Sequence, residues 1–146
     1  MKISPEGLAL IKEFEGLSMV AYPDPGTGGA PWTIGYGRAH GVKEGDTCTQ
    51  EEADAWLVED AVDAENCIND AVTVELTQCE FDALCSFVYN LGCRTFRASS
   101  VLRYLNQNNR HMATEYMLKY DKAAGNTLAG LTRRRRAEAA LFEGTA

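Results

Sequence analysis

The chain contains no uninterrupted apolar run of about 18 residues, the length that a membrane-spanning helix needs. We therefore expect no stable insertion into a membrane. The first residues also lack the apolar stretch of a signal peptide. We expect the product to accumulate in the cytoplasm unless another factor carries it out.

Positive charge is scarce as well. Fourteen Lys and Arg residues stand against 21 Asp and Glu residues, which gives a formal net charge of −7. Nucleic-acid-binding domains present a basic surface, so this balance argues against a nucleic-acid partner. With 146 residues the chain can form one domain, or two lobes that share a core.

Histidine and cysteine are too scattered to suggest a metal site. His40 and His111 stand alone and no Cys-x-x-Cys occurs, so we expect no metal and no cofactor. The odd cysteine count without a signal peptide favours buried or semi-buried free thiols. Oxidation outside the cell could still pair some of them, and the sequence does not say which. The cysteines are Cys48, Cys67, Cys79, Cys85 and Cys93.

The first third of the chain predicts a helix followed by a small sheet. Ser4-Pro5 is a helix start, and Gly16 is a helix stop. A loop rich in proline and glycine separates two strand-like segments. The expected elements are a helix over 5–15, strands over 17–22 and 32–37, a loop over 23–31, and irregular chain to about 47.

Helices dominate the rest of the chain. Capping boxes at 49–52 and 77–80 predict the starts of a long connecting helix, ending near 69, and of a core helix that ends at Gly92. Further helices are expected over 97–106, 110–121 and 132–143, with Thr132 capping the last. The predicted class is α+β, a single domain with a sheet-bearing lobe (1–48), a connecting helix (49–70) and a helical lobe (71–146).

Glu15 is the carboxyl group of the first helix that we expect beside the body of the protein. At about 100° per residue it falls next to Leu8 and Ile11, whereas Glu13 faces water. The negative end of the helix dipole and partial burial both disfavour ionisation of Glu15. A proton-donating role is therefore possible, although an ordinary helix-end glutamate is an alternative.

Asp24 and Thr33 flank the proline- and glycine-rich loop. Asp24 either has a functional role or bonds its own backbone in a turn. Thr33 should share one strand face with Gly35 and Gly37, which leaves room for a close approach to the backbone. Alternatively, the glycines merely bend the strand.

Several segments resemble the phage-type lysozymes, the endolysins of glycoside hydrolase family 24. The likeness covers nearly the whole chain in the right order. In the first half it is carried by Glu15-Gly16, Tyr22-x-Asp24 and Trp32-Thr33-Ile34-Gly35-Tyr36-Gly37. In the second half it is carried by Gln78-x-x-Phe81, Ser86-Phe87, Asn90-Leu91-Gly92, Phe96-x-x-Ser99-Ser100 and Gly130-Leu131-x-Arg133 with Glu138.

The resemblance implies a lysozyme-like fold and cleavage of the β-1,4 bond between N-acetylmuramic acid and N-acetylglucosamine in peptidoglycan. It assigns Glu15 as the proton donor, Asp24 as the carboxylate on the far side of the sugar ring, and Thr33 as a residue that holds the attacking water. Inversion at the anomeric carbon is expected, which requires the two carboxyl groups to lie roughly 6.5–9.5 Å apart.

The resemblance further suggests three substrate-binding residues. Arg38 stands where the family often has a histidine, Tyr89 takes an aromatic position that lines the family's cleft, and Ser99 matches a substrate-contacting serine. Packing or helix capping are alternative roles for Tyr89 and Ser99. The loop between Asp24 and Thr33 is longer than in the best-known member.

Four consecutive arginines, Arg133 to Arg136, form the densest positive segment. On a helix they sweep about 300°, so at least one should point inward and meet a carboxylate. We expect one of them to reach the active-site cleft and Glu15. Exposed arginines with their stems on the surface, or contact with anionic lipids, are alternatives.

Two other functions compete with a hydrolytic muramidase. A lytic transglycosylase uses one acid and needs no residues to hold water, so Asp24 and Thr33 argue against it. A murein-binding module without activity is the other alternative, and intact carboxyl groups argue against that. We expect a monomer that depends on a holin-type membrane lesion for access to peptidoglycan.

Overall fold

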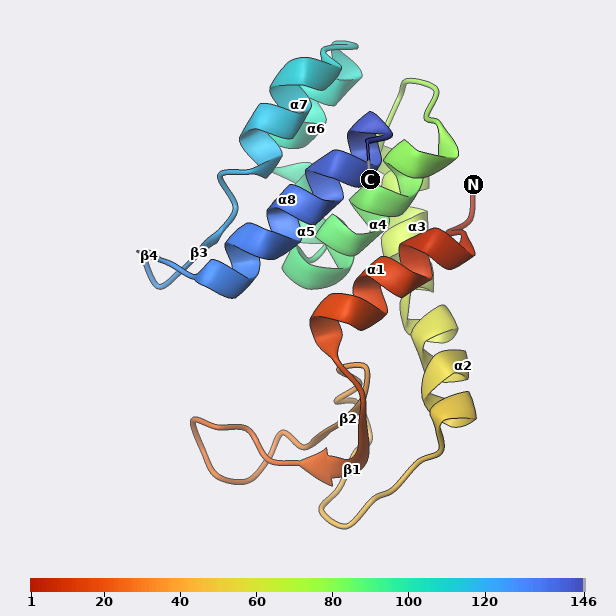
Figure 1. Cartoon of the computed structure of the whole chain (residues 1–146), viewed down its shortest axis with the longest axis vertical. Helices are drawn as coiled ribbons and strands as arrows, with labels where there is room; N and C mark the ends of the chain where they lie inside the picture. The colour runs from red at the N-terminus through yellow and green to blue at the C-terminus, as the bar shows by residue number, and fades with distance from the viewer. Residues whose placement is uncertain (146) are drawn as a thin grey trace. The chain divides into compact units, whose positions relative to one another are not determined.

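The computed structural model describes residues 1–145, and its backbone divides into two compact units. The first, here the sheet-bearing unit, is Lys12–Val62. The second, here the helical unit, combines Met1–Ile11 with the chain from Asp63 onward. Helices and two small antiparallel sheets make up the fold, so the predicted α+β class is confirmed (Figure 1). None of the helices in residues 1–145 has both the length and the apolarity to cross a membrane.

The first helix, α1 (Pro5–Glu15), begins and ends where the sequence predicts. Gly16 adopts φ +72°, a left-handed conformation that glycine adopts without strain. Its N–H donates to the carbonyl of Lys12 at 3.0 Å, which closes the last helical turn. Glu15 is therefore the terminal residue of a well-defined helix.

The sheet of the sheet-bearing unit is a short antiparallel hairpin of β1 (Ser18–Tyr22) and β2 (Thr33–Gly35). The predicted second strand over 32–37 is too long. Gly35 and Gly37 have φ of +65° and +97°, and Ile34 and Arg38 exchange two backbone hydrogen bonds of 2.9 Å. The glycines therefore bend the chain into a tight turn, as the alternative interpretation proposed.

The connecting helix is also not continuous. The structure has α2 (Gln50–Asp60) and α3 (Val62–Ala71) with a turn at Ala61 between them. No glycine or proline marks this break in the sequence. Acidic residues are unfavourable in the last turn of a helix and favourable in the first, and α2 ends in two acids where α3 begins with more. This charge placement favours an end and a new start within the predicted single helix.

The helical unit surrounds the central helix α4 (Gln78–Leu91), which begins at the predicted capping box and ends at Gly92. The last helix, α8 (Ala129–Glu143), packs along α4 (Figure 1). Phe81, Leu84 and Phe87 of α4 are fully buried, so the predicted core helix is confirmed. The remaining helices of this unit are α5 (Cys93–Arg97), α6 (Ser100–Asn106) and α7 (Arg110–Met117).

Three expectations for the C-terminal part are wrong. The helix expected over 97–106 begins only at Ser100, because α5 ends at Arg97 and Ser99 caps α6. The chain expected to prolong the helix over 110–121 instead leads into a hairpin of β3 (Lys122–Ala123) and β4 (Asn126–Thr127), with positive φ at both turn residues. Thr132 does not cap the last helix, because α8 begins three residues earlier. Its hydroxyl instead donates to Asp121 at 3.0 Å and to the Leu128 carbonyl at 3.2 Å.

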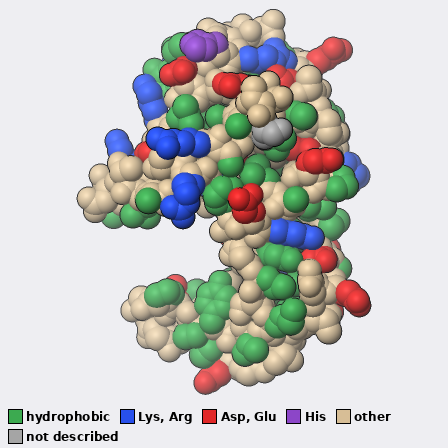
Figure 2. Space-filling view, in the orientation of Figure 1, with side chains coloured by type: hydrophobic (Ala, Val, Ile, Leu, Met, Phe, Trp, Pro, Cys, Tyr) green, Lys and Arg blue, Asp and Glu red, His purple; other side chains and the backbone are tan. Residues whose placement is uncertain are grey.

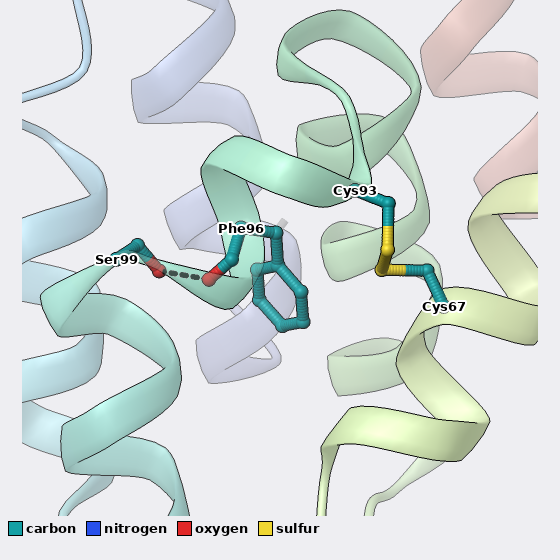
Figure 3. The surroundings of a disulfide bond; sticks show 4 residues. All are labelled: Cys67, Cys93, Phe96 and Ser99. Atoms are coloured by element: carbon teal, nitrogen blue, oxygen red, sulfur yellow. Dashed lines mark hydrogen bonds between the residues drawn. A yellow bond between two sulfur atoms is a disulfide. The ribbon is translucent and has the colours of Figure 1, made fainter.

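Two of the five cysteines form a disulfide, which corrects the expectation of free thiols for this pair. Cys67 on α3 is bonded to Cys93 at the start of α5, with their α-carbons 5.8 Å apart (Figure 3). They are 26 residues apart, and no local spacing motif signals the pairing. Cys48 and Cys85 are buried thiols, and Cys79 is exposed. Burial raises the pKa of the Cys48 and Cys85 thiols, so both are neutral.

Candidate active site

The three residues predicted to act on substrate all belong to the sheet-bearing unit. Glu15 ends α1 and is half-buried, whereas Glu13 is exposed, as the helical periodicity predicts. Asp24 follows β1 and Thr33 begins β2, and both are half-buried. One compact unit therefore supplies two carboxyl groups and a hydroxyl.

The carboxyl group of Glu15 lies against the glycine turn that follows β2. A β-carbon built on Gly37 would lie 3.1 Å from Glu15 Oε1 and 4.0 Å from Glu15 Cδ. At φ +97° this position also favours glycine for conformational reasons. The glycine expected to permit a close approach to the backbone is thus approached by Glu15 itself.

Asp24 organises the loop between the two strands. Its Oδ1 accepts the backbone N–H groups of Gly26 at 2.7 Å and Thr27 at 3.3 Å. Its own N–H donates to the Gly29 carbonyl at 2.9 Å. Asp24 therefore stabilises the turn, as the alternative interpretation expected, and only its Oδ1 takes part. Within residues 1–145 no hydrogen bond to Oδ2 is seen.

Strand pairing places the three residues along one hairpin. Tyr22 pairs with Thr33, so Asp24 lies two residues beyond the pair that contains Thr33. Ser18 pairs with Gly35, and Glu15 lies three residues before Ser18. Asp24 and Thr33 therefore lie at the end of the hairpin where the loop joins β1 to β2. Glu15 lies at the opposite end, against the glycine turn that follows β2. The register shifts between the two pairs, which are four residues apart on β1 and two residues apart on β2.

Arg38 is held by two neighbours on α2. Its Nη1 lies 3.2 Å from Glu59 Oε2, and its guanidinium lies 5.1 Å from the centre of the Trp56 ring. Arg38 and Trp56, together with His40 and Glu52, line a surface pocket of about 330 Å³ within the sheet-bearing unit. The arginine is therefore held at this pocket by an ion pair and a cation–π contact.

The other two suggested substrate-binding residues lie in the helical unit. Tyr89 is a half-buried residue of α4. Ser99 is buried and caps α6, since its hydroxyl accepts the Leu102 N–H at 3.2 Å and donates to the Phe96 carbonyl at 2.7 Å (Figure 3). Its capping role is confirmed, and substrate binding by either residue stays a prediction.

The arginine run splits into exposed and buried members. Arg133 and Arg136 are exposed, whereas Arg134 and Arg135 are buried. The guanidinium groups of the buried pair lie 3.2 Å and 2.9 Å from the carboxylate of Glu138, which is also buried. The prediction that at least one arginine meets a carboxylate inside the protein is confirmed. An arginine that reaches Glu15 stays a prediction.

The sequence does not indicate that Lys12, Tyr36 and Asp54 of the sheet-bearing unit form one group. Lys12 Nζ lies 3.1 Å from Asp54 Oδ1 and 5.6 Å from the centre of the Tyr36 ring. The Tyr36 hydroxyl lies beside the side chains of Asp54 and Gln50, and burial and the Asp54 carboxylate raise its pKa. Lys12 shares a helix face with Glu15, which is a weak signal. Nothing in the sequence pairs residue 12 with residue 54.

All of the net negative charge lies in the sheet-bearing unit. Lys12–Val62 contains three basic and ten acidic residues, while the helical unit contains eleven of each. Most Lys and Arg side chains visible in Figure 2 accordingly lie over the helical unit. Within residues 1–145 no group of three or more His, Cys, Asp or Glu side chains could hold a metal ion.

Comparison with known proteins places these observations in a family. The phage lysozyme family profile matches residues 12–138. The endolysin of Acyrthosiphon pisum secondary endosymbiont phage 1 is 42% identical over 147 residues, covering 98% of this chain and 99% of the relative.

Two solved structures share the fold over almost the whole chain. The muramidase domain of SpmX from Asticaccaulis excentricus has a TM-score of 0.89 and 40% identity, covering 97% of both chains. The endolysin from Escherichia coli O157:H7 phage FAHEc1 has a TM-score of 0.91 and 37% identity, covering 100% of this chain and 96% of that one. Both proteins bear names of cell-wall-degrading enzymes. The chain therefore belongs to the phage lysozyme family and is a glycoside hydrolase that cleaves peptidoglycan.

Proposed function

We propose that the protein hydrolyses the β-1,4 bond between N-acetylmuramic acid and N-acetylglucosamine with inversion at the anomeric carbon. The observation that carries the proposal is that one compact unit holds both carboxyl groups on either side of β2. Glu15 lies against Gly37 in the turn after β2, and Asp24 holds the start of the loop that leads into β2. An inverting glycosidase needs its carboxyl groups roughly 6.5–9.5 Å apart, with a water between one of them and the sugar.

In the proposed mechanism Glu15 protonates the glycosidic oxygen as the bond to the leaving sugar breaks. Asp24 acts on the opposite face, where Oδ2 takes a proton from the attacking water. The Thr33 hydroxyl holds that water in line with the anomeric carbon. The bond between Oδ1 and the turn supports this assignment, because it fixes the carboxylate while leaving the second oxygen open.

Arg38, Tyr89 and Ser99 are proposed to contact the substrate. Arg38 has the strongest support of the three, because Glu59 and Trp56 hold its guanidinium at a pocket of the sheet-bearing unit. Its donors suit the carbonyl and carboxylate groups of a muropeptide. Truncation of Arg38 should raise KM more than it lowers kcat.

Product analysis separates hydrolysis from the transglycosylase alternative. Hydrolysis in heavy-oxygen water puts one labelled oxygen on each new reducing end, whereas transglycosylation forms an unlabelled anhydro sugar. We expect labelled reducing ends, and NMR of the fresh products should show the α-anomer first. Anhydro products would contradict the proposal, and fresh β-anomers would contradict inversion alone.

The proposed biological role is host cell lysis by a monomer. We propose that the protein remains in the host cytoplasm until a holin-type membrane lesion gives it access to the cell wall. This part rests on family membership. Expression alone should leave cells intact, and co-expression with a holin should lyse them. Binding to purified sacculi without clearing them would instead support the inactive binding-module alternative.

A further inference from the structure

The position of the Glu15 carboxyl group depends on the turn that it touches. Gly37 lies close enough for a built β-carbon to come within 3.1 Å of Glu15 Oε1. The turn is closed at its base by the two hydrogen bonds between Ile34 and Arg38. A shift of this turn would therefore change the space available to the Glu15 carboxyl group.

Tyr36 lies between the two glycines of the turn and anchors it to α2. Its side chain is buried, with 7% of its surface exposed, and the side chains of Asp54 and Gln50 lie beside its hydroxyl. Burial raises the pKa of Tyr36 and the neighbouring Asp54 carboxylate raises it further, so the hydroxyl stays protonated beside that carboxylate. This anchor lies one residue from the glycine that meets Glu15.

Lys12 ties the other side of the contact to the same carboxylate. It stands three residues before Glu15 on α1, and its Nζ lies 3.1 Å from Asp54 Oδ1. Asp54 thus joins the helix that carries Glu15 to the turn that Glu15 touches. The ammonium group also lies 5.6 Å from the centre of the Tyr36 ring.

We propose that Lys12, Asp54 and Tyr36 form a positioning network that fixes the Glu15 carboxyl group for proton transfer. The proposal rests on the assignment of Glu15 as the proton donor. All three act through the contact between Glu15 and Gly37, so they are positioning residues. A displaced carboxyl group slows the reaction even when the substrate binds normally.

The exposure of the ion pair separates this role from a structural one. The side chains of Lys12 and Asp54 are 34% and 39% exposed, although Asp54 Oδ1 itself is buried, and partly exposed ion pairs add little to stability. If the ion pair served stability alone, its removal would therefore change Tm and kcat very little. A positioning network predicts a loss in kcat that exceeds any loss in thermal stability.

The test uses the full-length protein and dye-labelled murein sacculi, with apparent kcat, apparent KM and Tm measured for each variant. Tyr36→Phe keeps the ring and removes the hydroxyl. We expect kcat to fall about tenfold with KM changed by no more than about twofold. Tm should stay within about 4 °C of the wild type. Asp54→Asn should act in the same direction, and the double variant should be no slower than the slower single variant.

Matched variants complete the design. Lys12→Met should lower kcat because the ion pair to Asp54 is lost. Lys12→Arg should keep kcat near the wild-type value because arginine can also pair with Asp54. Lys43→Met, at an exposed lysine of the same unit, and Tyr116→Phe, in the helical unit, should leave kcat unchanged. The proposal is overturned if Tyr36→Phe keeps wild-type kcat. It is also overturned if Lys12→Arg is as slow as Lys12→Met.

Activity of the Glu15→Gln variant distinguishes a failure of the proton-donor assignment from a failure of the network proposal. If Glu15→Gln retains wild-type activity, the proton-donor assignment fails and the network proposal fails with it. If Glu15→Gln is inactive while Tyr36→Phe and Asp54→Asn are fully active, only the network proposal fails.

Discussion

Gly37 and Glu15 meet so closely that no larger residue fits at position 37 without displacing the carboxyl group. A β-carbon there would lie 3.1 Å from Glu15 Oε1, a contact tighter than most β-carbons make. The glycine that turns the chain after β2 is thus also the residue against which Glu15 rests. The backbone conformation at Gly37 and the position of the proposed proton donor are therefore linked.

Gly37→Ala should reduce activity for two separable reasons. The left-handed φ costs about 1–2 kcal/mol of stability for a residue with a β-carbon, and the new methyl group pushes on Glu15. We expect kcat to fall about tenfold or more. Gly45→Ala is the matched control, since Gly45 has φ +88° but open space around its α-carbon. Equal activity losses in both variants would show that strain alone is responsible.

Asp24→Asn should separate the turn role of Asp24 from its chemical role. The amide oxygen of asparagine can still accept the Gly26 and Thr27 N–H groups, so the loop should fold normally. The negative charge is lost, and lytic activity should fall about a hundredfold or more. Asp24→Ala should lose both activity and loop order. If Asp24→Asn were fully active and only Asp24→Ala impaired, the role of Asp24 would be confined to the turn.

The disulfide between Cys67 and Cys93 should stabilise the helical unit. The bond closes a loop between α3 and α5, and replacement of both cysteines by serine should lower the free energy of unfolding by about 2–4 kcal/mol. Chemical denaturation with and without a reductant measures this difference. Exposed Cys79 offers the control Cys79→Ser, which should unfold like the wild type under both conditions. No effect of reductant on the wild type would contradict the prediction.

Thiol labelling should distinguish the three free cysteines. Burial raises the pKa values of Cys48 and Cys85, so both stay protonated and shielded near neutral pH. In the native protein a thiol reagent should therefore modify Cys79 alone, and after unfolding it should modify all three. Rapid native labelling of Cys85, located by mass spectrometry, would contradict its burial.

The sequence predicts those features that depend on local chemistry. The two capping boxes, the glycine stop after Glu15 and the inward face of α1 follow from short-range rules, and the structure confirms them. The burial of charge within the arginine run also follows from helix geometry, because four consecutive residues cannot all face water.

Features that depend on contacts between residues far apart in the sequence cannot be predicted from such short-range rules. The turn at Ala61, the partner of Cys67 and the β3–β4 hairpin carry no strong local signal. The same holds for the site, where the motif indicates Glu15 but not the ion pair between Lys12 of the same helix and Asp54. This carboxylate, 42 residues beyond Lys12, becomes its partner only through tertiary packing.

Lytic activity of Glu15→Gln, compared with Glu13→Gln, tests the central assignment most directly. The two glutamates stand two residues apart on α1, one half-buried against the glycine turn and one exposed. Both variants should fold with wild-type Tm. Glu15→Gln should clear murein sacculi about a hundredfold more slowly or worse, because it cannot donate the proton, while Glu13→Gln should match the wild type. Wild-type clearing by Glu15→Gln would contradict the assignment.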